Sequence, residues 1–198
     1  AQTNASHVNL VGFLNNTGDF AINSVGNATD LLINGDVTLM GGGTLTLSNN
    51  TQNRIRGVSG TESFTNLNNT ISGGGQIGVN SLGVINLGTI FANGTATLEL
   101  DPSTTATLLN SGTITVAPAS KLLLYRGTFI NDASGTIDGG GTVDLFLASF
   151  FGVGTVTATF NVIAADMNPG VSGSGIVNVV GQYEHNVSGM LNIEVGGS

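Results

Sequence analysis

The sequence predicts an all-β fold, a right-handed parallel β-helix (β-solenoid) with about 22 residues per coil. Three observations lead to this prediction. Apolar and polar residues alternate over many short segments, a helical spacing of apolar residues is almost absent, and related sequence units recur at regular intervals.

The alternating segments are the predicted strands. In each of them Leu, Ile or Val alternates with polar residues, mainly Thr, so that one face is apolar and the other is polar. Gly, Asn, Asp or Ser stand at nearly every boundary between segments, as expected for turns. The clearest examples are residues 37–39, 44–47, 97–100, 113–116 and 155–157.

Two repeated units indicate the coil length. Residues 70–77, which contain three consecutive glycines, are matched by residues 136–143, at a distance that equals three coils of about 22 residues. A shorter copy at residues 39–45 precedes the first unit by a distance that is not a multiple of this length, so the period is not strict. A second unit, Asn followed shortly by Gly-Thr-Ile, recurs at steps close to one coil, at Asn86, Asn110 and Asn131.

A period of about 22 fits a coil of three short strands and three turns, in which each strand pairs with its equivalent one coil away, about 4.8 Å along the axis. Ile, Leu and Val then point inward, while Gly and Asn occupy turns that often require positive φ. Asn side chains at the turns are expected to stack in ladders, each amide bonding to the next. The chain gives roughly eight or nine coils and about 40 Å of solenoid.

The chain divides into three expected regions without a linker. Residues 1–30 are less regular and are expected to form an N-terminal cap or a strand-donating segment. Residues 31–166 carry the β-helix coils, and residues 167–198 are expected to form a C-terminal β module that continues the solenoid. The last residues stop within the pattern, so we expect either a piece of a longer rod or an end that docks onto a neighbour.

Composition excludes several classes of function. A formal net charge of −8 with only four Lys and Arg residues excludes electrostatic binding of nucleic acid or anionic lipid. Cysteine is absent, and the two histidines, His7 and His185, lie near opposite ends, so we expect no disulfide framework, no thiol chemistry, no metal site and no cofactor. No apolar run approaches the length of about 18 residues that a membrane-spanning helix needs, and we expect no membrane insertion.

The polar surface favours an extracellular location. The chain has 31 Gly, 24 Thr and 23 Asn but a single lysine, Lys121. Thr, Asn and Ser therefore supply the polar surface that Lys and Glu usually supply in cytosolic proteins. This composition predicts a secreted protein of a bacterial cell surface.

Residues 68–78 and 86–94 resemble repeats of large secreted bacterial β-helix proteins, the autotransporter-passenger-like and filamentous-haemagglutinin-like adhesins. Residues 169–173, 181–183 and 189–197 resemble another module common in such proteins. The resemblance covers about residues 31–198. It implies a β-helix fold and a secreted location, and the members of this group differ in activity.

Charged residues offer one interpretation as an enzyme. Asp132, Asp138 and Asp144 recur every six residues and would suit a polysaccharide hydrolase if two carboxylates met across the turns of one coil. The alternative is that these aspartates sit at turns and bond to their own backbone. A lyase would need a base, and the only candidates are Arg54, Arg56, Lys121 and Arg126. Arg54 and Arg56 alternate outward on one strand and are expected to form a solvated or interface pair.

Three further patterns have structural alternatives. Residues 139–144 come close to a calcium-binding nonapeptide repeat but depart from it at Thr142. Phe146, Phe150 and Phe151 form either a sugar-stacking patch or an internal aromatic stack, whereas Tyr125 and Tyr183 are isolated in sequence. Thr-x-Thr pairs invite an ice-binding interpretation, but their starting positions share no coil period: Thr44, Thr95, Thr105, Thr113 and Thr155.

These observations together predict a non-enzymatic extracellular structural or adhesive rod, with no catalytic, cofactor-binding or metal-binding residue. The expected partners are copies of the same chain, which would give a filament, or flanking solenoid coils of a long adhesin; surface polysaccharide is a further candidate. The alternative function is a polysaccharide-binding or polysaccharide-cleaving β-helix, and ice binding is a third. Whether the three aspartates line one groove distinguishes the first two.

Overall fold

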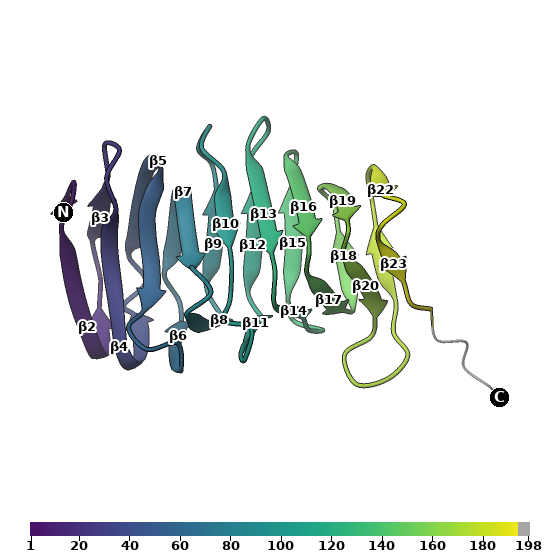
Figure 1. Ribbon diagram of the computed structural model, residues 1–198, viewed down its shortest axis with the longest axis horizontal. Coiled ribbons are helices and arrows are strands. Elements are labelled where there is room, and N and C mark those ends of the chain that lie inside the picture. Colours follow the sequence, from purple (N-terminus) through teal and green to yellow (C-terminus); the bar gives the residue numbers. More distant parts are fainter. Residues whose placement is uncertain (194–198) are drawn as a thin grey trace.

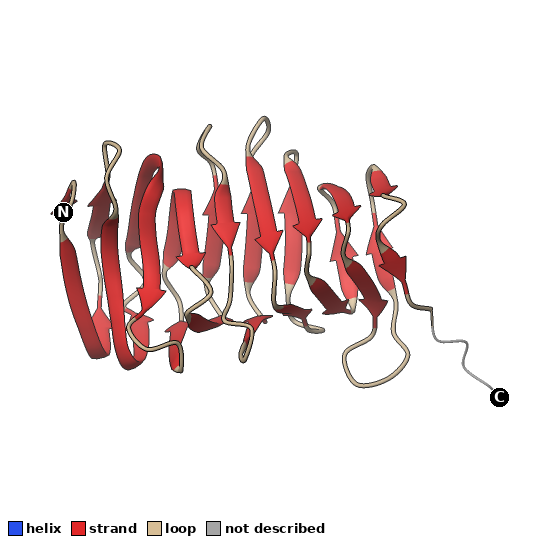
Figure 2. Cartoon of the chain, viewed as in Figure 1, coloured by secondary structure: helices blue, strands red, loops and turns tan. Residues whose placement is uncertain are grey.

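The computed structural model describes residues 1–193, and this part of the chain consists of strands and turns without a helix. The strands wind around a common axis and stack from the N-terminal end to the C-terminal end (Figure 1). Figure 2 shows that loops connect the strands at the corners and that one larger loop projects beyond the strands near the C-terminal end. The predicted fold class is confirmed: the chain is a parallel β-solenoid of about eight turns, with coils roughly 23 residues apart.

Within residues 1–193, three columns of parallel strands form the faces of the solenoid, and each column has nine rungs. Column I consists of the second halves of β2 (His7–Asn15) and β4 (Thr29–Met40), followed by β6 (Glu62–Asn66), β8 (Leu82–Asn86), β11 (Thr107–Asn110), β14 (Thr128–Asn131), β17 (Ser149–Gly152), β20 (Asp166–Pro169) and β23 (Met190–Leu191).

Column II consists of β1 (Gln2–Thr3), β3 (Asp19–Asn23), the first halves of β5 (Thr44–Gly57) and β7 (Thr70–Gly78), β9 (Thr89–Ala92), β12 (Thr113–Val116), β15 (Thr136–Gly139), β18 (Gly154–Val156) and β21 (Val177–Val179). Column III consists of the first halves of β2 and β4, the second halves of β5 and β7, then β10 (Leu98–Leu100), β13 (Lys121–Tyr125), β16 (Thr142–Phe146), β19 (Thr159–Ile163) and β22 (Tyr183–His185).

Residues 1–30, the expected cap or donor segment, lie in these same columns. β2 pairs with β4, β1 pairs with β3, and β3 pairs with β5, all in parallel. At the other end, β21, β22 and β23 form the last described rung. Residues 194–198 of the expected C-terminal module lie outside the described residues.

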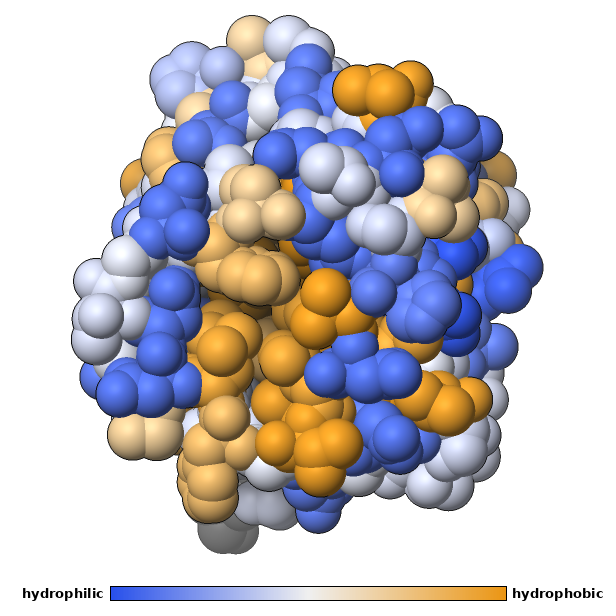
Figure 3. Space-filling model, turned by 90° about the vertical axis from the view of Figure 1, so that its left-hand side faces the viewer, coloured by the Kyte–Doolittle hydropathy of each residue, from blue (hydrophilic) through white to orange (hydrophobic). Residues whose placement is uncertain are grey.

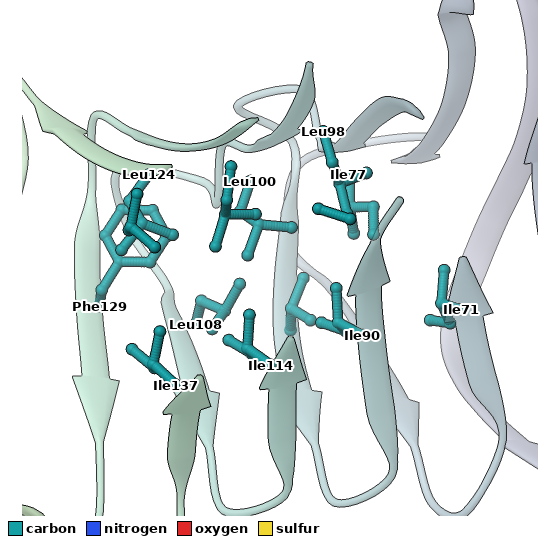
Figure 4. Packing of buried hydrophobic residues seen from close by; sticks show 14 of the residues in the cluster. Ile71, Ile77, Ile90, Leu98, Leu100, Leu108, Ile114, Leu124, Phe129 and Ile137 are labelled. Carbon is teal, nitrogen blue, oxygen red and sulfur yellow. The ribbon is translucent and has the colours of Figure 1, made fainter. Parts of the chain in front are cut away.

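Apolar side chains from the three columns fill the interior, as the alternation predicts. In column II one stack of directly paired residues is less than 3% exposed throughout: Ile71, Ile90, Ile114, Ile137 and Val156. Figure 4 shows the isoleucines of this stack on the same side of the interior, with Leu100 and Leu124 of column III and Leu108 of column I across from them. Full burial of such a side chain contributes about 1.5–3 kcal/mol, so the core is the main source of stability.

The glycine repeats mark a corner at which the backbone passes very close to the preceding coil. Gly73 and Gly139 both end a strand of column II, three coils apart, with φ angles of +117° and +113°. A Cβ on Gly73 would lie 1.8 Å from the carbonyl oxygen of Leu47, so no other residue fits there. The first triplet begins at Gly41, at the corner between columns I and II, and this different position explains its irregular spacing.

The asparagine repeats form the predicted ladder, at the end of column I. The Nδ2 of Asn66 donates to Oδ1 of Asn86 at 2.9 Å, Asn86 donates to Asn110 at 2.8 Å, and Asn110 donates to Asn131 at 2.7 Å. These four side chains are at most 2% exposed. Because the Nδ2 groups of these residues also donate to backbone carbonyls of the next coil, the ladder ties the corner between columns I and II in four consecutive coils.

Candidate functional site

The three aspartates proposed as acid and base do not form one site. Asp132 follows column I and accepts from the backbone N–H groups of Ser134 at 2.8 Å and Gly135 at 3.1 Å, the turn role that was the structural alternative. Asp138 lies in column II, and Asp144 lies in column III. The enzyme interpretation, in which they meet across the turns of one coil, does not fit this arrangement, because each comes from a different side of the coil.

All four basic residues lie on column III or directly after one of its strands. Arg54 donates to both carboxylate oxygens of Asp30, at 2.6 and 2.8 Å, and Arg56 donates to the same carboxylate at 2.9 Å. Burial opposes ionisation of Asp30, but the two guanidinium groups outweigh it and lower the pKa of this carboxyl. The expected arginine pair is thus a pair held by one acid from the preceding coil.

Lys121 forms an ion pair with Asp144 of the next coil, and the Nδ2 of Asn161 donates to the other oxygen of Asp144 at 2.8 Å. Because Asp144 is engaged by a lysine, the calcium-like segment 139–144 does not present a free carboxylate. Throughout residues 1–193, no three His, Cys, Asp or Glu side chains gather in a group that would hold a metal ion.

Sequence reasoning missed a pair of carboxylates on column III. Glu99 lies in β10 and Asp101 follows it, two residues on, and Glu99 accepts from Nε2 of Gln76 at 3.1 Å. Burial raises the pKa of both carboxyls, and the Asp101 charge raises that of Glu99 further, while the nearby Arg126 acts against both shifts. Asp101 is only 6% exposed, and its Oδ1 has no hydrogen-bond partner among the described residues. The alternation Leu98-Glu99-Leu100-Asp101 was the available signal, because it places the two acids at positions that alternate with two buried leucines.

The aromatic residues separate into two groups instead of one cluster. Phe150 points into the core and packs edge-to-face on Phe160, at 5.6 Å between ring centroids. Phe146 lies outside, stacked on Tyr125 at 5.8 Å with an interplanar angle of 10°, and the Arg126 guanidinium covers the Tyr125 ring at 4.6 Å. Phe146 and the Arg126 guanidinium both cover the Tyr125 ring, which reduces the ring surface available for stacking on a sugar.

A threonine column exists that the sequence spacing concealed. Five threonines occupy equivalent positions in successive rungs of column II: Thr44, Thr70, Thr89, Thr113 and Thr136. The Thr-x-Thr pairs were expected to share no coil period, and for Thr44 and Thr113 this expectation was wrong. The two residues occupy the same position in different rungs of column II, because coils of different length still align their strands. The next outward position along these strands is occupied by Phe91 in one rung and by Asp138 in another, so the array of hydroxyl groups is one residue wide.

One carboxylate closes the loop that leads into column I. Glu62 accepts from the backbone N–H and hydroxyl groups of Ser59 at 2.8 and 2.7 Å and from the N–H of Gly60 at 2.9 Å. Burial opposes the charge, but these bonds outweigh it and lower the pKa of Glu62 to about 2. Its role is to hold the loop between β5 and β6.

At both ends of the solenoid formed by residues 1–193, apolar residues are left uncovered by the other described residues. At the N-terminal end Val8 is 36% exposed, and Leu10 and Leu14 are only half-buried. Figure 3 looks onto this end and shows an apolar patch in its centre, surrounded mainly by polar residues. The C-terminal end contains a cavity of about 410 Å³, lined among others by Val177, Val179, Tyr183 and Leu191.

Comparisons with protein-family models, with curated proteins and with solved structures gave no match to this chain. Within residues 1–193, no helix has the length and apolar character needed to cross a membrane.

Proposed function

We propose that this chain is a non-enzymatic, extracellular structural or adhesive rod of a bacterial surface, which associates end to end into a filament or forms part of a longer adhesin rod. The uncovered apolar residues and unpaired strand edges at both ends of the described solenoid support this proposal most directly. Such edges favour addition of further strands. The stiffness of the rod would come from the ladder hydrogen bonds and the continuous core.

The partners in this proposal are copies of the same chain or flanking solenoid coils, with surface polysaccharide as a further candidate for adhesion. The net charge of −8 argues against nucleic acid and against insertion into an anionic membrane. The secreted location rests on the composition and on the resemblance to bacterial β-helix adhesins.

Negative-stain electron microscopy over a concentration series, with light scattering on the same samples, tests the end-to-end association. We expect fibres of uniform width whose length increases with concentration. Monodisperse particles a few nanometres long at every concentration would overturn it. A binding screen with surface polysaccharides tests the adhesive role separately.

A second candidate, a polysaccharide-processing enzyme, is favoured by one observation, the pair Glu99 and Asp101 with raised pKa values on one face. The test is release of products from acidic and neutral polysaccharides by the native chain and by Glu99→Gln. Asp138→Asn, on column II, is the matched control. Cleavage that Glu99→Gln abolishes and Asp138→Asn retains would favour the enzyme, and no cleavage by the native chain would exclude it for the substrates used.

A further inference from the structure

Column I carries a row of apolar side chains on the outside of the solenoid. The row lies on β8, β11, β14 and β17, which follow one another along the lower side of the solenoid in Figure 1. Its four residues are directly paired from rung to rung and alternate with buried core residues, so they point outward. This apolar stripe consists of Ile85, Leu109, Ile130 and Phe151. Leu67 and Leu87, 41% and 43% exposed, extend it at the corner that follows β6 and β8.

A row of small residues runs beside the stripe. It is formed by the first outward residue of the same four strands, two positions before the stripe residue in each. This lane consists of Gly83, Thr107, Thr128 and Ser149. Because large side chains stand beside small ones, the stripe projects further from the sheet than the lane. Two sheets that pack face to face interdigitate their side chains in this way, at a distance of about 10 Å.

The stripe and the lane are uncharged, although the chain has a net charge of −8. Column III, in contrast, presents Arg54, Glu99 and Asp144 on its outer face. Two copies of this acidic chain therefore repel each other less when they approach through column I. This distribution of charge points to a second copy as the occupant of the face.

The order of the two rows selects one arrangement of the copies. A two-fold axis parallel to the solenoid axis reverses the strand direction and keeps equal rungs at equal height. The stripe of each copy then lies on the lane of the other, so that Leu109 packs beside Thr107 of the second copy and Ile130 packs beside Thr128. A two-fold axis along the strands would instead place stripe on stripe and lane on lane.

The acids of column I agree with the first arrangement. Asp36 and Asp166 both occupy the lane position, before and after the four rungs of the stripe. The stripe positions of the same two rungs hold neutral residues, Thr38 and Asn168. With stripe on lane, each acid faces a neutral residue of the second copy. With lane on lane, the row that contains both acids would face itself.

We propose that two copies of the chain pair side by side through column I, with parallel solenoid axes and the same polarity, so that the apolar stripe of each copy packs on the lane of the other. Each copy contributes the same surface, and the contact closes as a dimer. The stripe lies on inner rungs, so further rungs before or after the described residues would leave it in place. The pairing does not depend on the end-to-end association proposed above.

Sedimentation equilibrium of the native chain and of Leu109→Lys tests the pairing. A lysine at the centre of the stripe would be buried without an acid opposite it, so we expect the dissociation constant of the dimer to rise by about tenfold or more. Leu123→Lys is the matched control, because Leu123 is a half-buried outward leucine of column III. It should leave the dissociation constant unchanged. Circular dichroism confirms that both variants are folded.

A second variant separates this packing from general apolar adhesion. Thr128→Phe adds an apolar ring to the lane and leaves the stripe intact. We expect weaker pairing, because the ring occupies the space into which Ile130 of the second copy packs. Stronger pairing by this variant would overturn the packing of stripe on lane.

Cross-linking tests the polarity, because the native chain has no cysteine. Thr65 and Asn168 lie at stripe positions of column I, five rungs apart, which is about 24 Å. With a short bismaleimide, Thr65→Cys should cross-link to Thr65→Cys, and Asn168→Cys should cross-link to Asn168→Cys. Cross-links that form only in a mixture of the two variants would overturn the parallel polarity.

The width and the length of particles in the electron microscope separate the two associations. Pairing predicts native particles two solenoids wide and Leu109→Lys particles one solenoid wide. A native chain that remains one solenoid wide and sediments without dimers would overturn the pairing, even if long fibres confirmed end-to-end association. Paired particles that do not lengthen with concentration would support the pairing and overturn the end-to-end association.

Discussion

Replacement of Asn110 by Asp tests whether the asparagine ladder holds the corner between columns I and II. Asn110 occupies a middle position and is 1% exposed. It accepts from Asn86 and donates to Oδ1 of Asn131 at 2.7 Å and to the carbonyl oxygen of Thr136 at 3.1 Å. Aspartate has nearly the same shape, so the substitution removes the two donated bonds and leaves the packing in place.

The size of the effect follows from the two acceptors left behind. Each buried polar group without a partner costs about 1–3 kcal/mol, so we expect a loss of roughly 2–6 kcal/mol of unfolding free energy at pH 7. A protonated aspartic acid has one O–H donor and can restore one of the two bonds. The loss is therefore expected to shrink by about 1–3 kcal/mol when the pH is lowered to 4.

Urea unfolding followed by circular dichroism at pH 7 and pH 4 measures both quantities. Asn93→Asp is the control, because it makes the same change in charge at an exposed position outside the ladder. Equal midpoints for Asn110→Asp and Asn93→Asp at pH 7 would refute the role of the ladder. A loss that is the same at both pH values would refute its assignment to missing donors.

Three further substitutions test other parts of the fold. Gly73→Ala should lower the unfolding free energy by more than about 2 kcal/mol, since it combines a strained positive φ with a clash against the Leu47 carbonyl oxygen. Gly26→Ala also has a positive φ but has open space around the new Cβ, so it should lower the unfolding free energy less. Urea midpoints of the two variants make the comparison. The pKa of Glu62 is lowered, so the stabilisation by this carboxylate is present above the unfolded pKa of 4.5 and is lost as the pH falls toward 2. Thermal melts between pH 5 and pH 2 should show this loss for the native chain but not for Glu62→Gln. The pKa of Glu99 is raised, so ionisation of this carboxyl destabilises the fold as the pH rises. Glu99→Gln should therefore be more stable than the native chain at pH 8, by up to about 0.5 kcal/mol, but not at pH 3. A native chain more stable than Glu99→Gln at pH 8 would contradict this sign.

The coil architecture was predictable because the glycine and asparagine units recur at intervals related to the coil length. Gly73 and Gly139 are three coils apart, as the spacing of the two glycine triplets indicated, and the asparagine unit proved to be a ladder. Both units reflect local requirements, a corner without space for a Cβ and a buried side chain that must both donate and accept. Such requirements restrict the residue type at one position of the coil and therefore leave a mark in the sequence.

Which outward residues become neighbours was less predictable, because the turns differ greatly in length from one coil to the next. The step from Val37 to its partner Phe64 is much longer than the step from Phe150 to its partner Met167, so sequence distance alone does not tell which outward residues become neighbours. For this reason the regular spacing of Asp132, Asp138 and Asp144 suggested a site that does not form. The pairing of Arg54 with Asp30 was hidden in the same way.

The order of charged residues along column III keeps carboxylates apart on neighbouring rungs. Its central outward positions read, from the first coil to the last, His7, Asp30, Arg54, Gln76, Glu99, Leu123, Asp144, Asn161 and Glu184. A base or a neutral residue always separates two carboxylates, as expected if like charges on neighbouring rungs destabilise a sheet. The requirement that like charges stay apart on neighbouring rungs thus accounts for the order of charged residues inside the column.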